Sequence, residues 1–232
     1  MSMPFYVSPE QVMTDKAEYA RKGVARGKSS IVLEFDGGIL LMAENPSSLS
    51  KIGEIYDRIA FAGVGKFSEF DLLRKVGIRF ADTKGYAYSR DDVRGRSLAN
   101  AYSQVVGDAF TQQLKPLEVE IVVVEVGDES LAGHENNAIY RVQYDGSISD
   151  HDGYCVIGGA SEDLTEYLRP EYKSGLPLGE TLRLGKTALE RARDGEPSTQ
   201  IENLEVCVLE RERSGRKFVR LNSDRIGELL GT

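Results

Sequence analysis

The sequence predicts an α+β fold in which two antiparallel sheets pack face to face between two outer layers of helices. Predicted strands arrive in adjacent groups and predicted helices follow in pairs, which is the order expected of such a four-layer sandwich. Residues 118–126 are dominated by valine and isoleucine, the pattern of a strand covered on both faces. At 232 residues, folding buries about 70% of the unfolded surface, so a single domain over residues 1–232 is expected.

A helix is predicted from Ser8 to Gly27, ahead of the first strand. Ser8 is a favourable N-cap, Pro9 suits the first helical position, and Gln11 is placed to close a capping box. Small or apolar residues recur along one face of this helix at Met13, Ala17, Ala20 and Val24. A helix in this place cannot connect two strands of a sheet, so it is an added element whose use needs an explanation.

The first group of elements follows this helix. Residues 30–43 are expected to form a hairpin across a glycine turn, and residues 56–62 a third strand. Two helices come next, one capped by Ser68 and one over residues 97–113, where apolar side chains form a continuous stripe.

The second half of the chain repeats this grouping. Its predicted elements are strands over 118–126, 139–144 and 154–157, helices over 161–172 and 178–192, a hairpin over 204–221 and a short helix from Ser223.

The composition excludes several classes of protein. The net charge of −8 argues against a general nucleic-acid or membrane-surface partner, because phosphates would be repelled. Cys155 and Cys207 lie in apolar runs and are predicted to be reduced core thiols. No stretch has the length of a membrane span or the pattern of a signal peptide, so an intracellular, cytoplasmic protein is expected.

No pattern of residues predicts a cofactor or a metal. Gly63-Val64-Gly65-Lys66 lacks the glycine spacing of a phosphate loop, and Phe67 stands where such a loop needs serine or threonine. His134 and His151, the only histidines, have no second ligand at metal-binding spacing and are expected to be solvated loop residues.

Several segments resemble a proteasome α subunit. They are the run from Ser8-Pro9 to Glu18-Tyr19-Ala20-Arg21, the strand at 39–43, and Ser50-Lys51-Ile52. The bacterial, actinobacterial type is the more similar, because Lys84-Gly85-Tyr86-Ala87-Tyr88 and Leu98-Ala99-Asn100-Ala101-Tyr102 also have counterparts there. The likeness covers essentially the whole chain.

The resemblance implies an N-terminal-nucleophile hydrolase sandwich over residues 28–232 but no catalytic residue in it. In the peptidase subunits of this family, a threonine freed by processing begins the first strand and uses its own α-amine to activate its hydroxyl. Lys28 falls at that position and has no hydroxyl. Glu44 and Lys51 lie near the family's acidic residue and lysine, but cannot perform that chemistry without the threonine.

The resemblance also implies a gate and a docking pocket. The gate consists of the tail over residues 1–7 and the start of the helix over residues 8–27, which are Met1, Ser2, Met3, Pro4, Phe5, Tyr6, Val7, Ser8 and Pro9. Lys51 is expected to bind the C-terminal carboxylate of an ATPase tail in a pocket between neighbouring subunits, with Glu18 supporting that pocket.

The implied partners are further copies of this chain in a ring of seven, proteasome β subunits, a hexameric proteasomal ATPase that docks through its C-terminal tails, and unfolded proteins in transit. Nucleic acid and membranes are not expected partners. Two other functions stay open on the sequence. One is an autonomous hydrolase of the same fold that uses Ser29 or Ser30 after processing. The other is a stand-alone binding module that uses residues 63–66.

Overall fold

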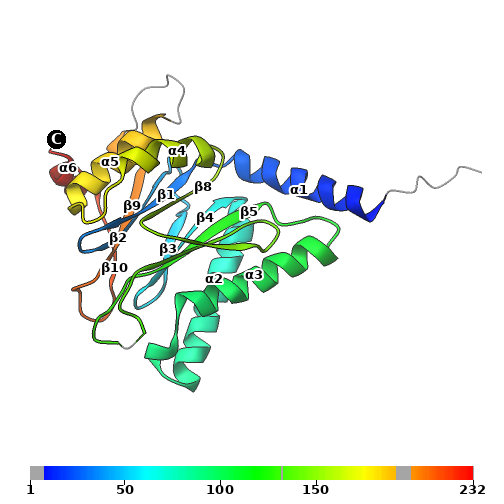
Figure 1. The fold of residues 1–232 in the computed structure, drawn as a ribbon, viewed down its shortest axis with the longest axis horizontal. Coiled ribbons are helices and arrows are strands. Elements are labelled where there is room, and N and C mark those ends of the chain that lie inside the picture. The colour runs from blue at the N-terminus through cyan, green and yellow to red at the C-terminus, as the bar shows by residue number, and fades with distance from the viewer. Residues whose placement is uncertain (1–7, 132, 192–199, 232) are drawn as a thin grey trace, which may run out of the picture.

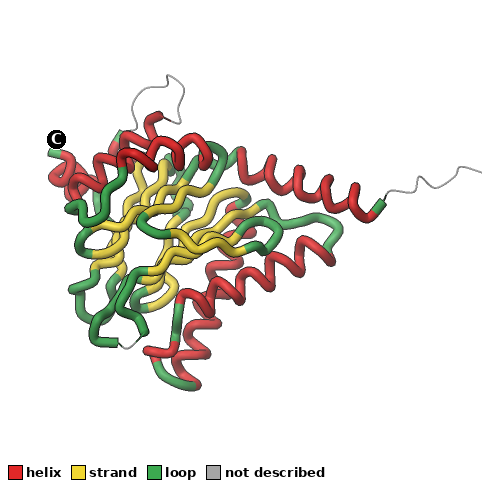
Figure 2. The backbone as a smooth tube through the Cα atoms, in the orientation of Figure 1, coloured by secondary structure: helices red, strands yellow, loops and turns green. Residues whose placement is uncertain are grey.

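The computed structural model describes residues 8–131, 133–191 and 200–231. Two five-stranded antiparallel sheets face each other, with helices on both outer faces (Figures 1 and 2). Their strand orders are β10-β9-β2-β1-β8 and β3-β4-β5-β6-β7. The predicted four-layer arrangement is therefore confirmed.

One sheet carries the first hairpin at its centre. It consists of β1 (Ser30–Phe35), β2 (Gly38–Glu44), β8 (Tyr154–Ile157), β9 (Leu204–Glu210) and β10 (Phe218–Arg220), and it is covered by α4 (Ser161–Glu171), α5 (Leu178–Arg191) and α6 (Ser223–Leu230). The other consists of β3 (Ile52–Tyr56), β4 (Ile59–Gly65), β5 (Val119–Glu125), β6 (Ala138–Val142) and β7 (Ile148–His151), and it is covered by α2 (Phe67–Ala87) and α3 (Gly95–Gln112).

The central strands are apolar on both faces because each face has its own partner. In β2, Leu41 belongs to the cluster between the two sheets, whereas Leu40 and Met42 pack under α5. In β5, Val122 belongs to the same inter-sheet cluster, and Val123 packs under α2 and α3. Side chains alternate between the faces of a strand, so a strand covered on both faces needs apolar residues throughout.

Two predicted elements differ from the structure. The strand predicted at 56–62 corresponds mainly to β4, and β3, which pairs with it as a hairpin, was not predicted, so four strands precede the first helix pair. Ser68 is not a cap, because α2 already begins at Phe67 with Lys66 as its N-cap. Gly77 lies inside this helix, which ends at Ala87. The absence of a side chain at Gly77 lets the Tyr102 hydroxyl of α3 approach closely.

The cysteine prediction is confirmed: Cys155 and Cys207 are free and buried, and burial raises the pKa of each thiol to about 12. None of the helices within the described ranges is both long enough and apolar enough to cross a membrane.

Candidate functional site

The added helix α1 (Pro9–Ala25) projects from one end of the sandwich (Figure 1). Ser8 caps it as predicted, because its Oγ accepts a hydrogen bond from the Gln11 N–H at 3.2 Å. The side-chain amide of Gln11 donates to Asp15 instead of completing the expected capping box. Only the second half of the helix is packed, since Ala20, Gly23 and Val24 are its buried residues.

Polar contacts fix the direction in which α1 projects. Lys16 Nζ donates to the Phe110 carbonyl at 3.0 Å, at the C-terminal end of α3, where a cation is favourable. Tyr19 Oη donates to Glu118 Oε1 at 3.1 Å, and Arg21 Nε donates to the Tyr144 hydroxyl at 2.8 Å. These contacts hold α1, from Lys16 to Arg21, against the end of α3 and the segments next to β5 and β6.

We expect Gly23→Ala to loosen this attachment. A Cβ at Gly23 would overlap the Glu118 side chain, so Glu118 would have to move away from Tyr19 and Lys115. Overpacking of this kind costs about 1–3 kcal/mol. Chemical denaturation should show this loss. Gly107→Ala, in α3, is the matched control, because its Cβ would make only ordinary contact at 3.5 Å, and a gain of up to about 1 kcal/mol in helix propensity is expected. Equal effects of the two substitutions would contradict the prediction.

Several apolar side chains of α1 are uncovered. Val12, Met13 and Tyr19 are exposed, and the long loop after α3 adds Leu114, which is 97% exposed. Between helix and loop lies a cavity of about 500 Å³, lined by Val12, Asp15, Lys16, Tyr19, Leu114, Lys115 and Pro116. Of the expected gate, Ser8 and Pro9 form the start of α1, whereas Met1 to Val7 lie outside the described residues.

Lys51 lies just before β3, where the start of β3 meets the start of β1 and the end of β2. Its Nζ donates to the carbonyl of Lys28, ahead of β1, at 2.9 Å and to the carbonyl of Glu44, at the end of β2, at 3.2 Å. The backbone N–H groups of Lys51 and Ile52 donate to the Glu205 carboxylate of β9, at 2.9 and 3.1 Å. The position of Lys51 is thus fixed at both its backbone and its ammonium group.

Charged side chains surround the Lys51 ammonium. Lys28 Nζ lies 2.5 Å from Glu44 Oε1, and Arg220 donates to Glu205 Oε1 at 2.6 Å. Burial, with a further contribution from the Lys28 charge, lowers the pKa of Lys51 to about 8, although Glu205 and Glu44 oppose the shift. Lys51 is therefore cationic at neutral pH but loses its proton at mildly alkaline pH.

Glu18 does not share this corner within one chain. It is exposed on α1, pairs with Lys22 at 3.2 Å, and lies roughly 10 Å along the helix axis from the end of α1 at 1.5 Å per residue. The contacts of Glu18 and Lys51 have no residue in common.

The serines of the alternative hydrolase are not placed for nucleophilic attack. Ser29 and Ser30 are 6% and 1% exposed. Ser29 Oγ accepts a hydrogen bond from the Ala160 N–H at 3.2 Å, so its hydroxyl binds the backbone of the loop just before α4.

The glycines of the alternative binding module are part of a strand. Gly63 and Gly65 lie in β4 and pair with Ile121 and Val119 of β5. Lys66 follows and pairs with Glu69 of α2 at 3.3 Å. No phosphate-binding loop forms at this place.

The prediction for the histidines is wrong. His134 is 6% exposed, and its Nδ1 lies 2.7 Å from Glu125 Oε1. His151 lies in β7 and is half-buried, and burial lowers its pKa. In the connection between β5 and β6, His134 lies against Glu125 and Arg58, which removes it from solvent.

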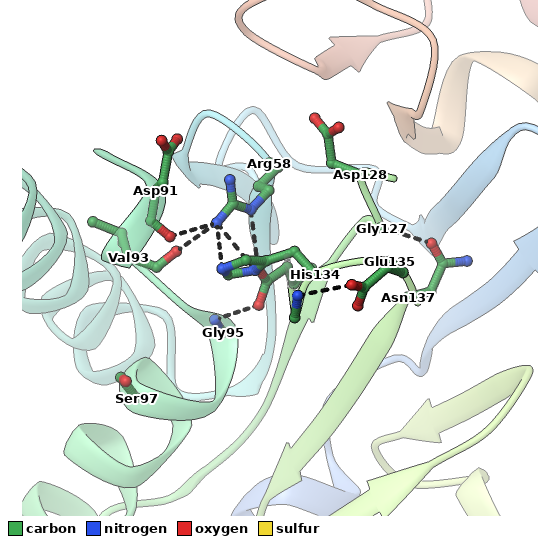
Figure 3. A network of polar contacts seen from close by, with 12 residues as sticks. Arg58, Asp91, Val93, Gly95, Ser97, Gly127, Asp128, His134, Glu135 and Asn137 are labelled. Atoms are coloured by element: carbon green, nitrogen blue, oxygen red, sulfur yellow. Dashed lines mark hydrogen bonds and ion pairs between the residues drawn. The ribbon is translucent and has the colours of Figure 1, made fainter. Parts of the chain in front are cut away.

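His134 belongs to a buried polar network that the sequence did not reveal (Figure 3). Arg58 Nε donates to Glu125 Oε1 at 2.9 Å, and its Nη2 donates to the carbonyls of Asp91 and Val93. Glu125 Oε2 accepts from the Gly95 N–H, at the start of α3, at 2.7 Å. The network fixes the turn between α2 and α3. Across the described parts of the chain, no group of three or more His, Cys, Asp or Glu side chains could hold a metal ion.

Comparison with known proteins gives a consistent result. The family model described as "Proteasome subunit" matches residues 24–209. The "Proteasome subunit alpha" of Acidothermus cellulolyticus is 52% identical, over 99% of this chain and 98% of that protein. Those of Thermobifida fusca and Streptosporangium roseum are 49% and 53% identical over 99% of this chain, and 91% and 87% of those proteins are covered.

Proposed function

This chain belongs to the proteasome subunit family as an α subunit, and from that premise we propose that it forms a ring which gates the proteasome and docks its ATPase. One observation carries the proposal. A capped and anchored helix continues directly into Lys28 at the head of the sandwich, where the catalytic relatives begin with a freed threonine. The segment that those relatives discard is here a structural element.

The head of β1 supports a noncatalytic role. Lys28 offers an ammonium group that is bound to Glu44, and it cannot act as a hydroxyl nucleophile. Ser29 and Ser30, the alternative nucleophiles, are buried. Catalysis in the assembled particle therefore belongs to the β subunits that this chain binds.

The exposed apolar side chains of α1 support assembly into a ring. Together with the adjacent cavity they form a patch that another copy of the chain would cover, in a ring of seven. Glu18 is an exposed residue of the same helix, so in the proposed ring it can approach the Lys51 of a neighbour. A pocket that contains both residues is completed only between two subunits.

Lys51 provides the charge for docking. In this proposal its ammonium binds the C-terminal carboxylate of a tail of a hexameric ATPase, which acts in the cytoplasm and delivers unfolded proteins. Three protons are available on an ammonium group, and two of them are used by the carbonyls of Lys28 and Glu44. The third can be donated to a ligand.

The division of the chain follows from these roles. Residues 1–7 form a gating tail over the pore, residues 8–27 the helix that carries the tail, and residues 28–232 the sandwich. Because α1 is fixed by Lys16, Tyr19 and Arg21, it gives the tail a defined point of origin.

Deletion of Met1 to Val7 is expected to raise peptide hydrolysis by the particle assembled with β subunits by at least severalfold. Ser8 is kept, so that the N-cap of α1 is retained. The measurement is the initial rate on a short fluorogenic peptide. Labelling of the β active sites with a covalent inhibitor serves as the control and should proceed equally in both particles. An unchanged rate would reject the gating role.

A further inference from the structure

Lys28 and Lys51 are joined through the same two residues. Lys51 Nζ donates to the backbone carbonyls of Lys28 and Glu44, while Lys28 Nζ binds the carboxylate of Glu44 at 2.5 Å. Both ammonium groups are therefore held near the junction between the head of β1 and the end of β2. The side chain of Lys28 remains 46% exposed, so a ligand from outside can reach this side chain.

The charges at this junction favour an anion. Among the residues that the structure describes, the cations of Lys28, Lys51 and Arg220 lie near the carboxylates of Glu44 and Glu205, so cations outnumber carboxylates by one within this named group. The chain as a whole has a net charge of −8. An incoming carboxylate would compensate the additional cation of this group.

We propose that Lys28 is the second cation of the docking pocket, and that Lys28 and Lys51 together bind the single C-terminal carboxylate of the ATPase tail. This inference rests on the proposed docking function. A carboxylate has two oxygens and can accept from two donors at once, and each such bond to a charged donor is stronger than a neutral one. Lys28, which stands at the position of the catalytic threonine of the peptidase subunits, thereby has a binding role.

The electrostatic coupling between the two lysines supports the inference. The Lys28 charge contributes to lowering the pKa of Lys51, whereas Glu205 from β9 and Glu44 from β2 raise it. Arg220 of β10 neutralises part of Glu205. A bound carboxylate relieves the repulsion between the two ammonium groups. Each lysine therefore increases the contribution of the other to binding of the carboxylate.

The test measures peptide binding to the particle assembled with β subunits. The probe is a fluorescent peptide with the last ten residues of the proteasomal ATPase from the same genome, prepared with a free and with an amidated C terminus. Fluorescence anisotropy gives both affinities for the wild type, Lys28→Met, Lys28→Arg and Lys51→Met. Lys75→Met is the matched control, because Lys75 is 59% exposed and also pairs with an acid, Asp71.

Lys28→Met is expected to weaken binding of the free-acid peptide about tenfold or more, with little change for the amidated peptide. Lys28→Arg keeps a cation and should retain most of the affinity, and Lys75→Met should match the wild type. Nearly half of the Lys28 side chain is exposed, so the Met variant should assemble normally, which size-exclusion chromatography would verify.

The pH profile separates a direct role from a merely structural one. In the wild type, binding of the free-acid peptide should weaken as the pH rises through about 8, because Lys51 then loses its proton. Without Lys28, the pKa of Lys51 rises and the decline should move to higher pH. An unchanged midpoint would count against the inference.

The outcomes distinguish the two proposals. If the wild type binds the free and amidated peptides equally, docking through a carboxylate fails altogether. If the wild type prefers the free acid and only Lys51→Met removes that preference, docking stands and the role of Lys28 is overturned.

Discussion

Lys51→Met is expected to abolish stimulation of the assembled proteasome by its ATPase, while hydrolysis of short peptides stays nearly unchanged. The charge-assisted bond lost in one pocket is worth about 1.5–3 kcal/mol, which is tenfold or more in affinity. Several tails of one ATPase ring bind at the same time, so the losses in separate pockets multiply. Two engaged tails already give a loss of about a hundredfold or more.

The substitution should spare the fold. Methionine is unbranched and fills the space of the lysine stem, and it removes a cation whose burial is unfavourable, as its lowered pKa shows. The measurement compares degradation of an unfolded protein with ATPase and ATP against hydrolysis of a short peptide without them. Lys75→Met should leave both rates at the wild-type level. Undiminished ATPase-dependent degradation by Lys51→Met would refute the docking role of Lys51.

The sequence predicted elements well where a local signal and the tertiary structure agree. The hairpin of β1 and β2 combines long apolar runs with a glycine turn, and both features are visible without the fold. Strand β3 was missed because Gly53 and Glu54 interrupt its apolar pattern. Gly53 is present because a Cβ there would lie 2.9 Å from the Arg74 side chain of α2, which is a tertiary constraint.

Helix α2 contains a glycine with a similar tertiary role. Gly77 reads as a helix end, yet it lies inside the helix and makes room for Tyr102. Gly27 likewise follows α1 without a positive φ, and a Cβ there would lie 2.5 Å from Val64 Cγ1. In both cases the glycine serves close packing between elements, which a single sequence does not distinguish from a stop signal.

The candidate site depends even more on contacts that the sequence alone does not predict. Lys51 was singled out only through the family resemblance, and its contacts with the carbonyls of Lys28 and Glu44 depend on how three strand ends meet. The burial of His134 depends on its loop folding back onto Glu125 and Arg58. Local polarity suggested solvent exposure, and only the fold supplies the partners that make burial tolerable.

Glu125→Ala is expected to destabilise the folded chain by about 3–5 kcal/mol, the cost of removing one partner from a buried ion pair. The Glu125 carboxylate accepts from Arg58, His134 and the Gly95 N–H, and the Arg58 side chain is only 7% exposed. Without the carboxylate, a buried guanidinium keeps only neutral partners, the carbonyls of Asp91 and Val93 and the His134 ring, and loses its counter-charge. Such a loss is a large fraction of the total of about 5–15 kcal/mol that holds a typical domain folded.

Chemical denaturation measures this loss, and Glu228→Ala provides the control, because the Arg225–Glu228 pair is exposed and should contribute about 1 kcal/mol or less. The double variant Arg58→Met/Glu125→Leu should recover much of the loss, since an apolar pair leaves no uncompensated charge. Because Gly95 begins α3, its amide should also exchange hydrogen faster in Glu125→Ala. If Glu125→Ala costs no more than Glu228→Ala, the network of Arg58, Glu125 and His134 does not hold the α2–α3 turn.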